Sequence, residues 1–380
     1  MKYIDRFKAF RTPCYYYDIE LLEKTLNTIV KSASKYPNFH VHYAVKANAN
    51  PRILGLISSY GLGADCVSGN EVLRALQCGF PASGIVYAGV GKSDREIEAA
   101  LRNDIFCFNC ESLPEIEVIN EIAGNLGKKA KIAIRVNPNV DAHTHAYITT
   151  GLEENKFGIY LTDLDRVIDQ AMTFPNIEVI GLHFHIGSQI TDLNVFKALA
   201  ERVNEIQDSL EARGIVLPNV NLGGGLGIDY NSPYSEPVAN FEGYFDTIAK
   251  YLRPRPGQQV HFEPGRSVVA HCGDLIARVL YVKEGKKKFA ILDAGMSDLI
   301  RPALYQAYHN IENITSESNE TELYDVVGPI CESSDCFGKD VELKKTKRGD
   351  MVILHSAGAY GEVMASEYNL RDLPSIYYSK

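Results

Sequence analysis

Lys46 is the first residue whose type and position suggest chemistry. It ends the apolar segment HYAVK, which we expect to form a strand over residues 41–46, and the polar residues ANAN follow it. A lysine at the end of a buried strand is costly unless its ammonium group is paired or used chemically, and Schiff-base formation is a common use. The alternative is a lysine that reaches solvent at the rim of its domain. Lys46 taken alone is compatible with both.

Two histidines, His183 and His185, stand two residues apart in the segment HFHIGS. Residues two apart in a strand point to the same side, so this pair could contribute to a metal site. Zinc or iron would require further ligands from other strand ends, and we expect no metal here. A flat imidazole can instead stack on a pyridine ring, and Ser188 can donate a hydrogen bond to a phosphate.

A glycine-rich turn, Gly223 to Gly225 followed by Gly227, ends another expected strand. Its unobstructed backbone N–H groups suit a phosphate, although a purely structural turn would have the same composition. The turn is not a dinucleotide-binding fingerprint, because it comes late in the chain and no acidic partner for a ribose follows at the expected distance.

Glu263 and Arg266 lie in the segment HFEPGR at the end of the last expected barrel strand. A carboxylate against the nitrogen of a pyridine ring keeps that nitrogen protonated, and a guanidinium binds a phosphate or a carboxylate through two hydrogen bonds. The alternative is a simple ion pair at the rim.

One cysteine differs from the others in its surroundings. Cys331 lies among polar turn residues in GPICESSD, where an exposed thiol could donate a proton. Cys107 and Cys110 lie inside an alternating strand with no second CxxC pair, so we assign them no redox or metal role.

The elements that must position these groups alternate between short β-branched segments and longer amphipathic ones, which is typical of β/α units around a parallel sheet. Eight strands and eight helices predict a closed (β/α)8 barrel of the TIM type, with its active site at the carboxyl ends of the strands. An open, doubly wound sheet is the alternative. The strands are expected at 41–46, 63–68, 85–89, 105–110, 131–138, 177–187, 219–225 and 259–265, and a further helix at about 19–35.

A second domain is expected after the barrel. Residues 275–295 alternate about a Gly/Lys turn, and the segment VELKKTKRGDMVILHSAG does the same about residues 348–350, so both predict β-hairpins. We therefore expect a barrel domain over 19–270 and a β domain formed by 1–18 and 271–380.

Composition restricts the possible partners. The chain has 380 residues, 45% hydrophobic residues and a formal charge of -9, and we find no basic stripe that would bind nucleic acid or an anionic membrane. Neither a signal-peptide core nor a run of membrane-spanning length occurs, and the eight cysteines are scattered through apolar segments. We expect a cytoplasmic protein that acts on a small molecule.

Eight motifs resemble, in the same order, those of the alanine-racemase-like, or ornithine-decarboxylase-like, pyridoxal 5'-phosphate (PLP) enzymes. Within this family the chain is most similar to the diaminopimelate decarboxylases, and the resemblance covers essentially its whole length. The motifs are YAVKAN, GADCVSGNE, HFHIGSQ, NLGGGLG, EPGRSVVA, GMSDLIRPALY, GPICESSD and GAYG.

The resemblance implies a role for each candidate residue. Lys46 would carry PLP as a Schiff base, His185 would stack on the cofactor and Glu263 would pair with the pyridinium. Residues around YYYD near the start of the chain would join the sheet of the β domain. The remaining groups implied to hold the cofactor are Ser188, Gly223, Gly224, Gly225, Gly265, Arg266 and Tyr360.

The resemblance also implies a homodimer in which the CESSD segment of one subunit completes the active site of the other. Cys331 and Glu332 would then act in trans, and Cys331 or Lys46 would protonate the product carbon. meso-2,6-Diaminopimelate, the implied substrate, carries an ammonium and a carboxylate at its far end, so its site needs an anion and a cation there. The groups that could provide them are Arg266, Arg301, Tyr305, Glu332 and Tyr360.

Three alternatives remain open from the residues. A PLP decarboxylase for ornithine, lysine or arginine would need only an acidic partner for the end group of its substrate, and Arg301 argues against it. A PLP-binding protein without catalysis would lack the CESSD and GAYG segments. A metal-dependent hydrolase would use His183 and His185 but would leave Lys46 without a role.

Overall fold

The computed structural model describes residues 7–140 and 156–380. The chain forms two compact units, which we describe separately. The barrel unit comprises 26–227 and 239–266, and the sheet unit comprises the residues up to Thr25 together with 228–238 and 267–380. The expected domain ranges differ from these units by the segments 228–238 and 267–270 and by the first part of the helix that begins at Ile19, so those ranges stay a prediction.

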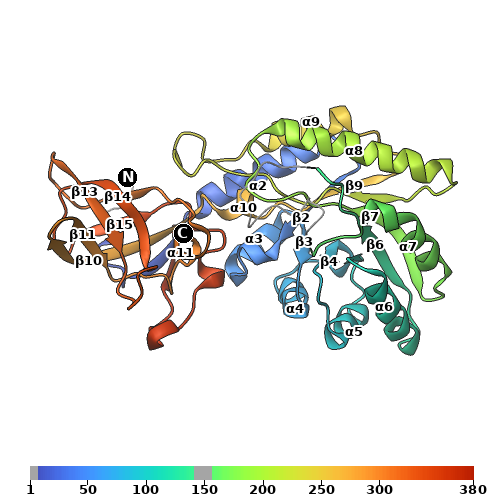
Figure 1. The fold of residues 1–380 in the computed structure, drawn as a ribbon, viewed down its shortest axis with the longest axis horizontal. Coiled ribbons are helices and arrows are strands. Elements are labelled where there is room, and N and C mark those ends of the chain that lie inside the picture. The colour runs from blue at the N-terminus through green and yellow to red at the C-terminus, as the bar shows by residue number, and fades with distance from the viewer. Residues whose placement is uncertain (1–6, 141–155) are drawn as a thin grey trace. The chain divides into compact units, whose positions relative to one another are not determined.

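The barrel unit contains a closed barrel of eight parallel strands, as the alternating pattern predicts (Figure 1). Each strand pairs with the next along the chain, and the first closes on the last through pairs such as Val41 with Phe262. The strands are Phe39–Ala44 (β2), Gly63–Cys66 (β3), Ile85–Tyr87 (β4), Cys107–Cys110 (β5), Ala130–Arg135 (β6), Ile177–His183 (β7), Asn219–Asn221 (β8) and Gln259–Phe262 (β9).

Amphipathic helices connect these strands and lie outside them in Figure 1; one further helix precedes the first strand and a short one follows the last. Side-chain caps start several helices: Ser68 Oγ accepts a hydrogen bond from the N–H of Glu71, and Asn50 caps a helix that opens with Pro51. The helices are Ile19–Ala33 (α2), Pro51–Ser59 (α3), Gly69–Gln77 (α4), Asp94–Arg102 (α5), Leu113–Asn125 (α6), Leu161–Thr173 (α7), Leu193–Ala212 (α8), Phe241–Tyr251 (α9) and Arg266–Val269 (α10).

Several barrel strands end earlier than the sequence predicts. Strand β2 stops at Ala44, and Lys46 lies in a 3-10 turn, Val45–Ala47. Strand β7 stops at His183, so His185 belongs to the loop that follows it. The predicted strands were too long because the loops at the carboxyl end of the barrel are also rich in buried apolar residues. The candidate residues consequently lie on turns just beyond the strands.

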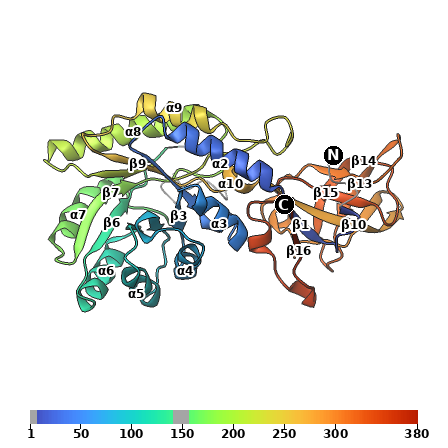
Figure 2. The same ribbon diagram turned by 180° about the vertical axis from the view of Figure 1, so that it is seen from behind.

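The sheet unit is built on the strand order β12-β15-β10-β11-β13-β14. Figure 2 shows β1 and β16 in the same unit; β1 pairs with both β10 and β16, which confirms that the YYYD region joins this sheet. The strands are Cys14–Tyr17 (β1), Gly273–Glu284 (β10), Lys288–Leu292 (β11), Ile311–Asn313 (β12), Thr321–Val327 (β13), Cys336–Lys344 (β14), Met351–Leu354 (β15) and Ser375–Tyr378 (β16), with the short helix Arg301–Tyr305 (α11).

One of the two predicted hairpins is correct. Strands β10 and β11 pair antiparallel about the Gly/Lys turn. The prediction about residues 348–350 was wrong, because β14 pairs with β13 whereas β15 pairs with β10 and β12. Alternation marks both strands correctly but does not specify their partners.

Among the described residues, no helix is long and apolar enough to cross a membrane.

Candidate active site

The glycine turn after β8 is packed so closely that no side chain fits there. A Cβ atom on Gly223 would lie 2.3 Å from the carbonyl oxygen of Phe184, and one on Gly224 would lie 2.2 Å from that of Glu263. Gly223 and Gly225 also have positive φ angles of 68° and 116°. The turn therefore presents bare backbone at the carboxyl end of the barrel, as a phosphate site requires.

Lys46 lies next to this end of the barrel, in the turn after β2. Its positive charge acts on three other side chains there. Burial raises the pKa values of Asp65 and Glu71, and Lys46 opposes this rise. Lys46 also lowers the pKa of His185, in the same direction as burial. Gly265 packs against the same turn, since a Cβ on it would be 3.0 Å from the Cβ of Ala44. The backbone N–H of Ala44 also donates to the carbonyl of Pro264 at 3.1 Å.

Glu263 follows directly after β9 and is the most heavily hydrogen-bonded carboxylate of this site. Its Oε1 accepts from the side-chain amides of Asn109 at 3.0 Å and Asn221 at 2.6 Å, and its Oε2 lies 2.9 Å from Nε2 of His183. Burial alone would raise the pKa of Glu263, but the interaction with His183 holds it well below the ordinary value. The carboxylate is therefore ionised although it is buried.

His185 is neutral. Burial is the main reason why its pKa lies well below the ordinary value, and the positive charges of Lys46 and Arg135 lower it further. The N–H of Gly224 donates to its Nδ1 at 3.3 Å, so the ring proton is on Nε2. The two histidines of HFHIGS thus have different partners, and a neutral, flat ring is available for stacking.

Ser188 and Arg266 are joined by hydrogen bonds. Nε and Nη2 of Arg266 donate to Oγ of Ser188 at 3.3 and 2.9 Å. These bonds place a guanidinium beside a hydroxyl in the barrel unit. A guanidinium and a hydroxyl are the donors expected for a phosphate.

Sequence reasoning missed several buried polar residues of the barrel. Asp65 is 3% exposed, its Oδ1 has no hydrogen-bond partner, and burial followed by the charge of Glu263 raises its pKa well above the ordinary value. Arg135 forms a 2.6 Å ion pair with Glu111. The signal that could have found these residues is a polar side chain at the last or next-to-last position of a barrel strand, as for Asp65, Asn109, Arg135 and Asn221.

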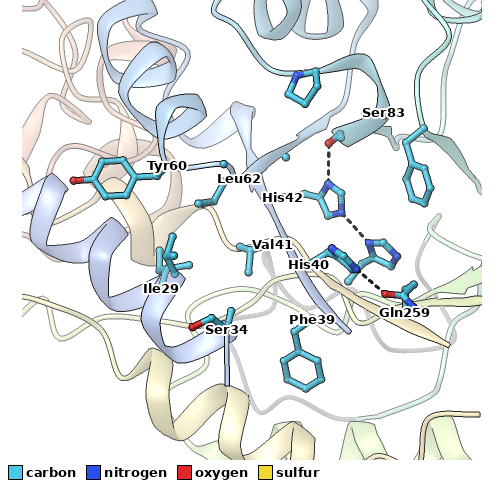
Figure 3. Close-up of a pocket in the computed structure, with 18 of the residues that line it drawn as sticks. Ile29, Ser34, Phe39, His40, Val41, His42, Tyr60, Leu62, Ser83 and Gln259 are labelled. Atoms are coloured by element: carbon cyan, nitrogen blue, oxygen red, sulfur yellow. Dashed lines mark hydrogen bonds between the residues drawn. The ribbon is translucent and has the colours of Figure 1, made fainter. Parts of the chain in front are cut away.

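A cavity of about 430 Å³ lies at the opposite, amino-terminal end of the barrel (Figure 3). Its lining comes from barrel strands, from the end of helix α2 and from loops. It includes His40, His42, His261 and Gln259, and the Nε2 atoms of His40 and His42 are hydrogen-bonded to Gln259 and His261. None of the predicted site residues lines it. Because barrel enzymes use the other end of their strands, we do not assign the chemistry to this cavity.

The remaining predicted residues lie in the sheet unit. Arg301 begins helix α11 and is buried, and Tyr305 ends the same helix and is half-buried. Tyr360 is half-buried and has a φ of 57°, an unusual backbone conformation for a bulky residue. Strain of this kind is often retained at functional sites.

Cys331 and Glu332 lie on an exposed loop between β13 and β14, as the polar sequence predicts. Asp335 fixes this loop: its Oδ1 accepts from the N–H of Met296 at 2.6 Å and its Oδ2 from the N–H of Ile330 at 2.7 Å. The Tyr368 hydroxyl donates to Oε1 of Glu332. The thiol and the carboxylate are thus presented at the surface by a loop with internal support.

The barrel residues fit PLP chemically. The glycine turn is backbone without side chains, Lys46 can bond to an aldehyde, and Glu263 is an ionised carboxylate suited to a protonated pyridine nitrogen. A comparison with known families agrees, because the model described as "Pyridoxal-dependent decarboxylase, pyridoxal binding domain" matches residues 22–270. The chain belongs to the pyridoxal-dependent decarboxylases.

Similar proteins narrow this assignment within the pyridoxal-dependent decarboxylases. A diaminopimelate decarboxylase of Bacteroides thetaiotaomicron is 62% identical over 99% of this chain and 97% of that protein. One of Aquifex aeolicus is 41% identical over 96% of this chain and 86% of that protein. The crystal structure of the Helicobacter pylori enzyme complexed with L-lysine covers all of this chain and 94% of that one, with 42% identity and a TM-score of 0.92.

Proposed function

We propose that the protein removes CO2 from meso-2,6-diaminopimelate to give L-lysine, the last step of lysine biosynthesis. The observation that carries this proposal is Glu263, an ionised carboxylate held by three side chains at the end of the barrel where Lys46 lies. The similarity to diaminopimelate decarboxylases along nearly the whole chain supports the choice of substrate. PLP, when bound, supplies an electron sink for the carbon that loses CO2.

The barrel residues hold and tune the cofactor in this proposal. Lys46 would hold its aldehyde carbon, and the neutral ring of His185 would stack on its pyridine ring. Glu263 keeps the pyridine nitrogen protonated, which the electron sink requires. The phosphate is held by Ser188, Gly223, Gly224, Gly225, Gly265 and Arg266, with Tyr360 from the sheet unit.

The residues of the sheet unit recognise the substrate and return a proton. Arg301 binds the carboxylate at the non-reacting end, Glu332 binds the ammonium there, and Tyr305, Tyr360 and Arg266 complete the substrate site. Cys331 or Lys46 then donates a proton to the carbon that has lost CO2. Ornithine has no carboxylate at its non-reacting end, so Arg301 would have no group to bind in an ornithine decarboxylase.

The activity is tested by assaying the purified protein with diaminopimelate, ornithine, lysine and arginine. We expect turnover of diaminopimelate with release of L-lysine, and preferred turnover of ornithine would overturn the substrate. The cofactor is tested by absorption spectroscopy, in which Lys46→Ala should abolish the band of the lysine-bound cofactor. A colourless wild-type protein containing a metal would refute the PLP assignment.

We also propose that the active enzyme is a homodimer with Cys331 and Glu332 supplied in trans. The support is their position on an exposed loop that Asp335 holds in shape. Mixing inactive Lys46→Ala and Cys331→Ala subunits tests this arrangement, because a mixed dimer regains one intact site. Free exchange should restore about a quarter of wild-type activity, and a mixture that stays inactive after exchange would contradict shared sites.

The cytoplasm is the proposed location. All eight cysteines are free thiols, and five of them pack in buried positions. Fractionation of cells that express the protein from its own gene should recover it with the cytoplasmic enzymes.

A further inference from the structure

The guanidinium of Arg301 is held by a buried histidine of the same unit. Nη1 of Arg301 donates to Nε2 of His309 at 2.8 Å, and Nδ1 of His309 lies 2.8 Å from the backbone oxygen of His355. An arginine only donates and a carbonyl only accepts, so Nε2 must carry the lone pair and Nδ1 the proton. These two contacts fix His309 as a neutral ring in a single tautomer.

A neutral acceptor suits an arginine that must bind an anion. A carboxylate in the place of His309 would orient the guanidinium and also cancel its charge. The imidazole fixes the direction of Nη1 without cancelling the positive charge of the guanidinium, which attracts a substrate carboxylate. Since Arg301 is 6% exposed and His309 is 1% exposed, water competes little for this hydrogen bond.

Tyr230 supports the same pair from a different segment. Its ring centroid is 5.0 Å from Cζ of Arg301, within cation–π range, and 5.4 Å from the ring of His309 at an interplanar angle of 82°. The hydrogen bond to the imidazole and the contact with the face of the Tyr230 ring therefore restrict the position of the guanidinium from two sides.

The sheet anchors His309 itself. The N–H of His355, just after β15, donates to the carbonyl of Asn310 at 2.9 Å, beside the antiparallel pairing of β12 with β15. The ring of His355 contacts Asp274 at 3.2 Å and Glu312 at 3.6 Å, so β10 and β12 are tied to the same point. The acceptor for Arg301 is therefore part of a rigid framework and not of a free loop.

We propose that His309 is a positioning residue for substrate choice: it holds Arg301, with Tyr230, in the orientation that binds the carboxylate at the non-reacting end of the substrate. This inference rests on the proposed function, because it assigns Arg301 to that carboxylate. It predicts that His309 affects ligands that carry this carboxylate and leaves ligands without it unaffected.

Two product-like inhibitors test the inference in the PLP-loaded enzyme. L-Lysine retains the carboxylate of the non-reacting end, whereas 1,5-diaminopentane lacks it. We expect His309→Leu to weaken inhibition by L-lysine about tenfold, the loss of roughly one hydrogen bond to a charged group. Inhibition by 1,5-diaminopentane and the cofactor spectrum should not change, and the KM for diaminopimelate should rise more than kcat falls.

Two further variants separate positioning from folding. His309→Gln offers an oxygen to Arg301 and an N–H to the carbonyl of His355, so it should recover most of the L-lysine binding. His261→Leu removes a histidine that is also buried and hydrogen-bonded at both nitrogens, 2.9 Å to each partner, but belongs to the amino-terminal end of the barrel. It should leave the ratio of the two inhibition constants at the wild-type value.

The remaining outcomes are distinguishable. Equal weakening of both inhibitors by His309→Leu, or no change in either, would overturn the positioning role. Arg301→Lys should weaken L-lysine inhibition at least as strongly as His309→Leu. If Arg301→Lys has no effect, or the wild type does not act on diaminopimelate, the proposed function fails before His309 is considered.

Discussion

Asn221 donates a 2.6 Å hydrogen bond from its side-chain amide to Oε1 of Glu263, and this contact joins the ends of two neighbouring barrel strands. Asn109 donates to the same oxygen from across the barrel at 3.0 Å. The two amides satisfy one oxygen while His183 lies against the other. A carboxylate with several donors keeps its charge in a buried site, which is the property that the cofactor chemistry requires.

Glu263→Gln should therefore lower activity without releasing the cofactor. The amide carries no charge to keep the pyridine nitrogen protonated, and its NH2 group faces a donor. We expect kcat to fall about 100-fold or more, the scale of a lost acid–base contribution, while the absorption of the dialysed protein shows PLP retained. Asp350→Asn alters a buried carboxylate of the sheet unit and should keep kcat. A kcat within threefold of wild type for Glu263→Gln would contradict its role.

Gly224→Ala should destabilise the protein strongly. The new Cβ would lie 2.2 Å from the carbonyl oxygen of Glu263, and backbone on both sides must move. We expect a loss of about 2–4 kcal/mol in the free energy of unfolding, with weaker retention of PLP. The control is Gly55→Ala, whose Cβ meets nothing within 4 Å inside helix α3, and which should be neutral or stabilising. Equal stability of both variants would contradict the prediction, because it would show that the backbone of the turn can move to accommodate a Cβ atom at little cost.

His355 should make stability depend on pH. Asp274 and Glu312 raise its pKa to about 9, against the opposing effect of burial. Because the folded pKa is above the unfolded one of about 6.5, the stabilisation is complete below pH 6.5 and is lost as the pH rises through 9, up to about 3 kcal/mol. Denaturant unfolding across this range should show the decline, and His355→Gln should flatten it. An equally steep decline in that variant would assign the effect to another group.

Asp335→Asn should loosen the loop that carries Cys331. The amide keeps one acceptor oxygen, so the N–H of either Met296 or Ile330 loses its partner, at a cost of about 1–3 kcal/mol. We expect a lower melting temperature and a lower kcat, with the cofactor spectrum unchanged. Asp340→Asn changes an exposed partner of Lys287 and should alter neither. Full activity with a lower melting temperature would separate the loop from catalysis.

The sequence by itself determined the strand and helix segments of the barrel, the β-rich second part, and the groups that carry the proposed chemistry. Alternation and glycine content are local properties of the chain, so they can be recognised without knowing which segments pack together. Lys46, Glu263 and the Gly223 to Gly225 turn could be selected because each is unusual where it stands.

Only the tertiary structure decided which residues work together. Asn109 and Asn221 are ordinary polar residues in short strands until closure of the barrel brings them to Glu263, 154 and 42 residues away. The same holds for His309 with Arg301 and Tyr230, and for β14 and β15, whose partners differ from those that adjacency in the chain suggests. Hydrogen bonds and ring contacts act over a few ångströms in space. The number of residues between two positions in the sequence does not say whether they lie that close in the folded protein.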